Sequence, residues 1–175
     1  MTKWDTRPVP IHFSATGGHE IGHQGLLHHL RDIPKGTESR MQYPASTWLH
    51  LGASIGAKHT DIMRGPEAEK NSAIGPRFSA SSSTLYELGE NALDQSGIRP
   101  EYYFPEPVGT PVSGEARDIE SRGGHFISFR GGHHYFHSPQ DTVDVAVDPI
   151  KISQWGTAAV LVALGLTTYR EGGDS

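Results

Sequence analysis

The spacing of apolar and polar residues predicts a chain in which strands and helices alternate. Apolar residues that alternate with polar ones, or runs of β-branched and aromatic residues, predict short strands at residues 9–15, 47–51, 77–80, 101–104 and 125–129. Apolar residues at helical spacing predict helices at residues 20–30, 83–95, 114–120 and 149–169. This alternation indicates an α/β fold, and we expect a three-layer sandwich with a central mixed, mostly parallel sheet.

Two of the predicted helices begin with residues that are typical of helix N-termini. Ser83 precedes a stripe of leucine and alanine residues, and serine is a residue type that caps helices. Asp148 is followed by Pro149, and proline is favoured at the first helical position because its missing N–H has no helical partner there. We expect the last helix to bury its apolar run, residues 155–166, in the core.

The composition argues against some classes of binding partner and indicates in which cellular compartment the protein resides. At 175 residues, 35% of them hydrophobic, the chain fits a single domain spanning residues 1–175. Its net charge of -5 argues against nucleic acid and against an anionic membrane surface as partners. The absence of cysteine excludes disulfides and thiolate metal ligands. The first residues contain no apolar signal core, and no apolar run approaches membrane-spanning length, so we expect a soluble protein and favour the cytoplasm.

Histidine and carboxylate side chains concentrate in two stretches that are far apart in the sequence. Residues 17–29 hold four of the 11 histidines together with Glu20, after two glycines that allow the backbone to turn sharply. The second stretch, residues 133–142, contributes His133, His134, His137 and Asp141. Imidazole and carboxylate groups are natural ligands of zinc. We therefore predict that folding brings the two stretches together to form one site.

The first stretch contains the string His19-Glu20-Ile21-Gly22-His23, which matches the H-E-x-x-H signature of zincins. On a helix, His19 and His23 would lie one turn apart on one face, with Glu20 placed to polarise a water. His29 stands where metzincins place a third ligand, and residues 39–44 resemble the methionine turn of that family. This resemblance implies a protease with a single zinc ion. Against it, Leu26 stands where that family has a glycine.

A second resemblance covers most of the chain. A strand that ends in a turn with Glu20, a following helix, and the loop Phe136-His137-Ser138-Pro139-Gln140-Asp141-Thr142 before a long C-terminal helix resemble the co-catalytic zinc aminopeptidases. The family is that of aminopeptidase Y and the bacterial leucyl aminopeptidases. The resemblance implies its three-layer fold, one or two zinc ions, and a peptide or small amide as substrate. It implies that Glu20 and His137 are zinc ligands, and it places His19 at the position of the general base.

Further polar residues are candidates for the same site. His23 joins His19 as a candidate metal ligand, and the candidates for binding the substrate are His50, Glu115, Arg117 and Asp141. Each also has an ordinary structural explanation. The histidines are then hydrogen-bonded structural imidazoles, Glu115 and Arg117 belong with Asp118 to a solvated short helix, and Asp141 forms a turn with Thr142.

The departures from the aminopeptidase family bear on activity and on assembly. His19 replaces the general-base glutamate, and no carboxylate follows His50, where that family has an aspartate ligand. The resemblance covers the C-terminal half to two-thirds of such a domain, which predicts that a homodimer or a complementing polypeptide completes the fold. We expect either a zinc-dependent hydrolase that is impaired as an isolated chain, or a non-catalytic pseudo-enzyme or binding module on the same fold.

Overall fold

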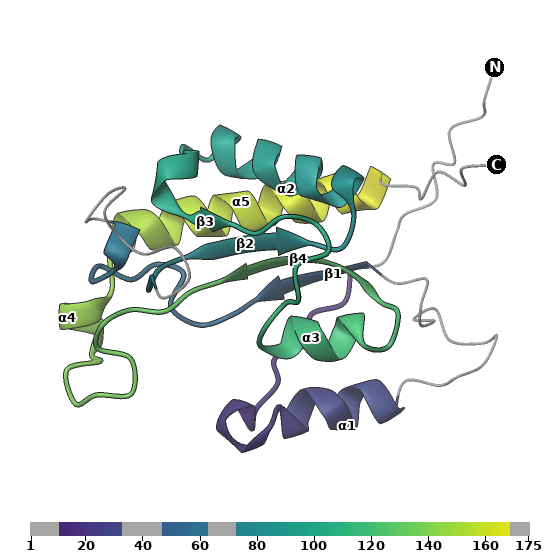
Figure 1. Cartoon of the computed structure of the whole chain (residues 1–175), viewed down its shortest axis with the longest axis horizontal. Coiled ribbons are helices and arrows are strands. Elements are labelled where there is room, and N and C mark those ends of the chain that lie inside the picture. The colour runs from purple at the N-terminus through teal and green to yellow at the C-terminus, as the bar shows by residue number, and fades with distance from the viewer. Residues whose placement is uncertain (1–10, 33–46, 63–72, 169–175) are drawn as a thin grey trace.

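The computed structural model describes residues 11–32, 47–62 and 73–168, and at its centre lies a four-stranded sheet (Figure 1). The strands, in the order β1-β4-β2-β3, are β1 (Thr47–Leu51), β4 (His125–Arg130), β2 (Arg77–Ala80) and β3 (Phe104–Pro105). β1 pairs in parallel with β4 and β2 with β3, whereas β2 and β4 are antiparallel. The predicted α/β class is confirmed, and the sheet is mixed.

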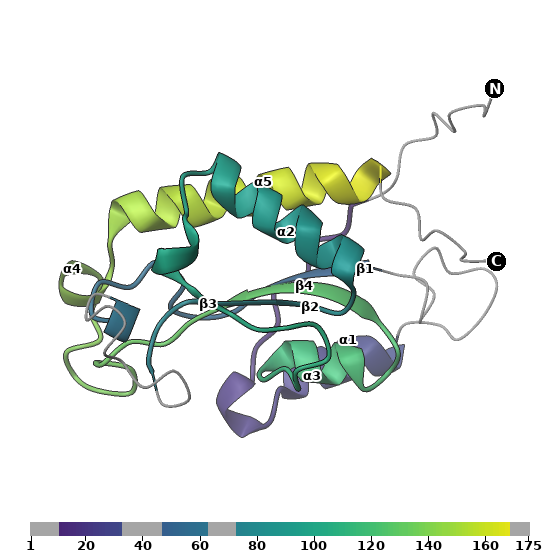
Figure 2. The same cartoon turned by 45° about the horizontal axis from the view of Figure 1, so that its top comes forward.

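Helices cover both faces of this sheet. Figures 1 and 2 show α2 (Ser83–Gln95) and α5 (Pro149–Thr168) on one face, and α1 (Gln24–Asp32) and α3 (Glu115–Glu120) on the other. The 3-10 helix η1 (His19–Ile21) precedes α1, and the short helix α4 (Val143–Ala146) precedes α5. The histidine-rich turn before α1 lies on the same face of the sheet as α3.

The alternation of side chains along β4 divides the core into two clusters. Phe126 packs with α1 and α3, whereas Ile127 and Phe129 pack with α2 and α5, and all three are at most 2% exposed. On the second face the ring of Phe129 lies 5.8 Å from that of Phe78 and 5.2 Å from that of Trp155, between centroids. β4 is therefore buried on both faces, and its three apolar residues are divided between the two clusters.

The cap predicted for α5 is confirmed, and the cap of α2 lies one residue before the predicted one. Asp148 Oδ1 accepts the backbone N–H of Ile150 at 2.9 Å. At α2 the capping residue is Ser82, whose Oγ accepts the N–H of Leu85 at 3.3 Å. Ser82 has the extended backbone of an N-cap, whereas Ser83 is already helical.

Residues 11–15 do not form the predicted strand, and residues 9 and 10 lie outside the described part of the chain. The segment is exposed, with Phe13 at 95%. A strand needs a neighbour to satisfy its backbone N–H and C=O groups. None of the four described strands pairs with this segment, so the alternating pattern alone does not produce a strand here.

The helix predicted at residues 20–30 is interrupted near its start. Gly22 and His23 have left-handed backbones, with φ of 82° and 58°, so the 3-10 helix η1 ends before them and α1 begins at Gln24. The prediction from the H-E-x-x-H string, that His19 and His23 lie one turn apart on one face of a helix, is therefore wrong. The predicted methionine turn at residues 39–44 lies outside the described residues.

The strand predicted at residues 101–104 is also largely replaced. Residues Pro100–Tyr102 form the 3-10 helix η3, and strand β3 contains only Phe104 and Pro105. Proline at the first position of η3 fixes φ at a helical value, which favours a turn over a strand. Of the aromatic residues that suggested a strand, Tyr103 instead packs in the core and is only 2% exposed, whereas Tyr102 is 53% exposed.

Helix α5 corrects the expectation that no apolar run reaches membrane-spanning length. With 20 residues and a mean hydropathy of 1.3, it is long and apolar enough by length and composition. It packs against α2 and the sheet through Trp155, Ala158 and Val162, which are all at most 2% exposed. The predicted burial of the run at residues 155–166 is therefore confirmed for one side of the helix only, because Val160 and Leu164 on α5 are each 59% exposed.

Candidate metal centre

A compact turn between Gly17 and Gly25 presents the first histidines. The N–H of Gly25 donates to the carbonyl of Gly17 at 2.9 Å, and the N–H of Gln24 donates to Gly18 at 3.2 Å. Position 25 requires glycine, because a Cβ there would lie 2.4 Å from the Gly17 oxygen. The turn brings the imidazoles of His19 and His23 side by side, with ring centroids 5.0 Å apart.

Two carboxylates of α3 meet these two imidazoles. Glu115 Oε1 lies 2.7 Å from His19 Nδ1, and Asp118 Oδ2 lies 2.6 Å from His23 Nδ1. Residues three apart on a helix lie on the same face, so α3 presents both carboxylates to the turn. The pair of His23 and Asp118 is well shielded, with side chains 11% and 18% exposed.

A third histidine, from β1, approaches the same carboxylate. His50 Nε2 lies 3.5 Å from Glu115 Oε2, and its Nδ1 lies 2.8 Å from the hydroxyl oxygen of Ser128 on β4. Ser128 is fully buried, and the His50 side chain is only 10% exposed. The parallel register of β1 and β4, which pairs His50 with Ser128, places the two side chains together. His50 and Ser128 therefore hold Glu115 from the sheet side.

The charges of this group follow from its contacts. The hydrogen bond to Glu115 raises the pKa of His19 above its ordinary value, although partial burial works in the other direction. Burial lowers the pKa of His50 despite the nearby Glu115. Burial also works to raise the pKa of Glu115, but its hydrogen bonds and the nearby histidines outweigh burial, and the net pKa is lowered. Glu115 is therefore held as a charged carboxylate among histidines, and its negative charge favours the binding of a cation.

The donor atoms of His19, His23 and Glu115 lie within 4.8 Å of one another, and these three residues are the group that fits a metal ion among the described residues. Two histidines and one glutamate form a donor set found in catalytic zinc sites. Ligand atoms about 2.1 Å from one zinc ion lie roughly 3.4 Å apart in tetrahedral geometry. Side-chain adjustments of about an ångström would therefore complete the site. Asp118 occupies Nδ1 of His23, which leaves Nε2 of that ring for a metal.

A second contact joins the two histidine-rich stretches. Glu20 Oε1 lies 3.0 Å from His137 Nε2, although 117 residues separate them in the sequence. The prediction that folding brings the stretches together is confirmed at this contact. The two side chains are 66% and 61% exposed, and exposed ion pairs contribute only about 0–1 kcal/mol to stability. Their contact is thus a feature of the surface beside the metal group and adds little to the core.

The backbone of His137 is unusual. It has a φ of 61°, in the left-handed region that residues other than glycine rarely adopt, and His23 shares this property with a φ of 58°. The ring of His137 stacks on that of Phe136, with centroids 4.0 Å apart. Non-glycine residues in this conformation cluster at functional sites, where the surrounding structure holds them.

The other predicted site residues lie elsewhere. Asp141 Oδ1 lies 3.2 Å from Nε2 of the buried His133, within the same loop. Arg117 is exposed on α3, between the two carboxylates that face the histidines. His29 lies edge-on to Trp48 and is not part of the metal group. The third donor of the group is thus Glu115 and not His29.

Sequence reasoning placed Glu115 in a substrate site and missed the role of Asp118 as the partner of His23. The three-residue spacing of these carboxylates on a short helix was the available signal. Ser128 gave no signal, because a serine in a strand is ordinary and its contact with His50 depends on strand register. Contacts of this kind depend on tertiary structure.

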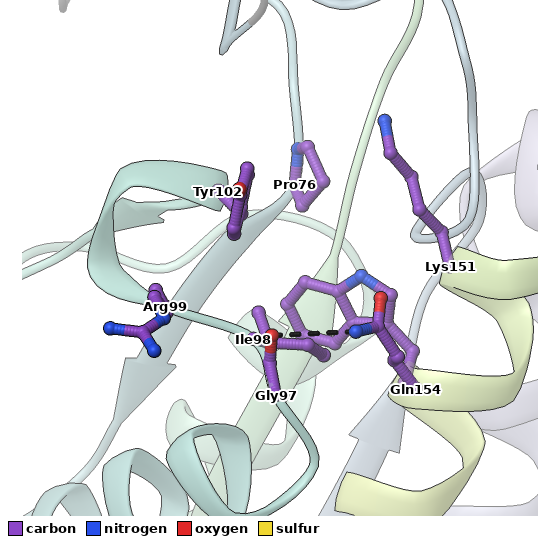
Figure 3. Close-up of a pocket in the computed structure, with 8 residues that line it drawn as sticks. Pro76, Gly97, Ile98, Arg99, Tyr102, Lys151 and Gln154 are labelled. Carbon is purple, nitrogen blue, oxygen red and sulfur yellow. Dashed lines mark hydrogen bonds between the residues drawn. The ribbon is translucent and has the colours of Figure 1, made fainter.

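The structure also contains a cavity of about 270 Å³ on the α2–α5 side (Figure 3). It is lined by residues of the loop after α2 and the first turns of α5, among them Arg99, Tyr102 and Trp155. Two of its polar side chains have partners: Gln154 Nε2 donates to the carbonyl of Gly97 at 3.3 Å, and Lys151 Nζ donates to that of Ala57 at 3.0 Å. The chemistry-bearing residues gather on the opposite face of the sheet.

The chain was compared with protein families, with curated proteins and with solved structures, and none of these comparisons finds a match. Arguments about its function therefore rest on the geometry of the described residues.

Proposed function

We propose that this chain is a metal-dependent hydrolase that binds zinc through His19, His23 and Glu115 and cleaves a peptide or amide bond. The observation that carries the proposal is the convergence of these three donors, within 4.8 Å, from a turn and a helix that are nearly one hundred residues apart. Three protein ligands leave one position of a tetrahedral zinc site open for water or substrate, as catalytic sites require.

The surrounding residues support a role in catalysis over a purely structural one. Asp118 fixes the orientation of the His23 ring, as carboxylate partners of metal-ligating histidines do. His50 and Ser128 hold Glu115 from the sheet side. When bound, the zinc ion would polarise the carbonyl of the scissile bond and lower the pKa of a water. Glu20, which directly follows the ligand His19, and its partner His137 are both exposed.

The fold of the zinc aminopeptidases remains part of the proposal. A mixed sheet with helices on both faces supports their three-layer architecture. The contact of Glu20 with His137 agrees with the ligand pair that the resemblance implies, and a second zinc ion bound by this pair is the co-catalytic version of the proposal. We favour the version with a single ion, because His19, His23 and Glu115 together offer three donors to one ion, whereas Glu20 and His137 offer only two to a second.

Zinc titration tests the metal centre directly. Zinc should raise the melting temperature, because a ligand that binds the native state stabilises it by mass action. His23→Ala and Glu115→Gln should remove this increase, since each deletes a ligand. His59→Ala is the matched control, because His59 packs against Tyr135 and is not part of the metal group. An equal loss in all three variants would mean non-specific binding to histidines and would contradict the proposal.

Turnover separates the hydrolase from the non-catalytic alternative. The zinc-loaded chain should cleave reporters from a panel of aminoacyl p-nitroanilides, and Glu115→Gln should abolish the cleavage. Specific zinc binding without cleavage of any reporter would favour a binding module on the same fold.

A further inference from the structure

We propose that the cavity on the α2–α5 side of the sheet is a binding site for a small aromatic carboxylate. This site is separate from the metal centre, which lies on the face that α1 and α3 cover, and it does not depend on the proposed hydrolase function. The inference starts from the charges and the apolar surfaces that line the cavity of about 270 Å³.

The charged side chains that line the cavity are both cationic. Arg99 directly precedes η3, and Lys151 lies in the first turn of α5. None of the described residues that line the cavity carries a carboxylate, although the whole chain has a net charge of -5. A hollow whose walls carry charge of one sign concentrates ligands of the opposite sign, so the cavity favours an anion.

Both cations have N–H groups left for a ligand. Lys151 Nζ donates to the neutral carbonyl of Ala57 at 3.0 Å, and an ammonium group has further donors beyond this one. Arg99 is exposed, and its guanidinium has no hydrogen bond or ion pair with any of the described residues. By contrast, the buried Arg130 is paired with the carboxylate of Glu106. The positive charge at the cavity is therefore not neutralised from within the described part of the chain.

The remaining wall favours a ligand with an apolar body. The buried residues Pro76, Ile98 and Trp155 line it, and Tyr102, which is 53% exposed, adds an aromatic ring. Ligand sites combine such apolar walls with a few polar groups that fix the orientation of the ligand.

The two kinds of wall lie close together. Figure 3 shows Lys151 and Gln154, both on α5, at one side of the cavity and Tyr102 at the other. The volume is slightly below the range of about 300–1,000 Å³ that is typical of ligand sites, so the ligand must be small. Inorganic phosphate would leave the apolar wall uncovered, whereas a carboxylate on an aromatic ring matches both walls.

Titration with phenylacetate tests the site, because this probe joins a carboxylate to a small apolar ring. Proton–nitrogen NMR spectra of the full chain, freed of zinc so that the carboxylate has no metal to bind, should show saturable shifts of the backbone amides of Gly97, Ile98 and Gln154. Phenylacetamide has nearly the same shape without the charge and should bind about tenfold more weakly, the usual cost of losing a charged hydrogen-bond partner. Inorganic phosphate should also bind more weakly, because it has no apolar body.

Variants of the two cations locate the recognition of charge. Lys151→Gln should weaken the binding of phenylacetate by about tenfold, because glutamine retains a donor for the Ala57 carbonyl and only the charge is lost. Arg99→Gln, at an exposed position, should weaken it as well. Lys58→Gln is the matched control, since Lys58 also donates to a backbone carbonyl, that of Asp144 at 3.1 Å, and does not line the cavity.

Several results would overturn the proposal. Equal binding of phenylacetate and phenylacetamide would show that the charge plays no part, and equal binding of phenylacetate and phosphate would show the same for the apolar wall. Shifts that do not saturate, or that fall outside the cavity, would mean non-specific contact. An unchanged affinity in both cation variants would also contradict the site. The hydrolase stands or falls separately, with the zinc titration and His23→Ala.

Discussion

At the scale of single residues, the site depends on side chains that hydrogen-bond to the proposed ligands without being ligands themselves. Asp118 is the clearest example, because its carboxylate lies 2.6 Å from the Nδ1 of a mostly buried histidine. Asp118→Asn should weaken zinc binding by about 10–100-fold, the usual cost of losing such a partner, with little effect on the fold. Calorimetric titration measures the affinity, and Glu120→Gln, an exposed carboxylate on the same helix, is the control. Equal affinities for Asp118→Asn and the wild type would mean that His23 is held by its backbone alone.

Tyr103 gives a residue-scale prediction about stability. Burial raises the pKa of its hydroxyl to about 12 from an ordinary value of 10.0, and the nearby Glu90 adds to the shift. Between these values the unfolded chain loses the phenol proton more readily than the native chain does, so stability should fall as the pH rises above about 10. Urea unfolding between pH 8 and 11.5 measures this slope. Tyr103→Phe should flatten it, and an identical slope in the variant would show that other groups cause the loss.

At the scale of elements, the turn before α1 determines whether the ligands converge. Gly25→Ala would place a methyl group 2.4 Å from the carbonyl oxygen of Gly17, so the turn must open and separate His19 from the α3 carboxylates. We expect a loss of zinc affinity of at least tenfold, with the far-ultraviolet spectrum nearly unchanged. Gly156→Ala is the control, because nothing lies within 4 Å of its added Cβ on α5 and alanine favours a helix. Normal zinc binding by Gly25→Ala would contradict the role of the turn.

Elements with a strong local pattern were predictable, and those that depend on a neighbour were not. β4 is rich in aromatic and β-branched residues, α5 carries a long apolar run, and α2 combines a helical stripe with a serine cap, so their positions could be predicted from the sequence. Residues 11–15 have the alternation of a strand and yet form none, because strands need a paired neighbour. The break in the helix at His23 could also not be predicted from the sequence, since residues other than glycine uncommonly adopt a positive φ.

The candidate site was predictable in its residue types and not in its partners. The density of histidine and carboxylate in residues 17–29 and 133–142 predicted a site, and Glu20 and His137 do meet. The pairing of Glu115 with His19 and of Asp118 with His23 joins segments about one hundred residues apart, and it depends on how α3 lies on the sheet. No local pattern encodes that packing. The sequence therefore predicted the residue types of the candidate site more closely than the contacts among them.

At the scale of the whole molecule, one edge of the sheet carries an exposed apolar side chain. β1 is one of the two edge strands, its outer side pairs with none of the described strands, and its Leu51 is 52% exposed. The unpaired segment after residue 10 adds Phe13 at 95%. Exposed strand edges and apolar patches usually pair with another chain. This arrangement supports the earlier expectation of a homodimer or a complementing polypeptide.

We accordingly predict that the chain self-associates, most simply as a two-fold dimer, through the β1 edge and the segment that carries Phe13. Light scattering after size exclusion, at several protein concentrations with and without salt, measures the mass. Because the contact is largely apolar, added salt should not dissociate it. Phe13→Lys should shift the equilibrium towards the monomer, because a charge beside the partner strand would be costly to bury. Val143→Lys, at a site on α4 that is 75% exposed, should leave the mass unchanged. A monomer at every concentration would show that the β1 edge is satisfied without a second copy.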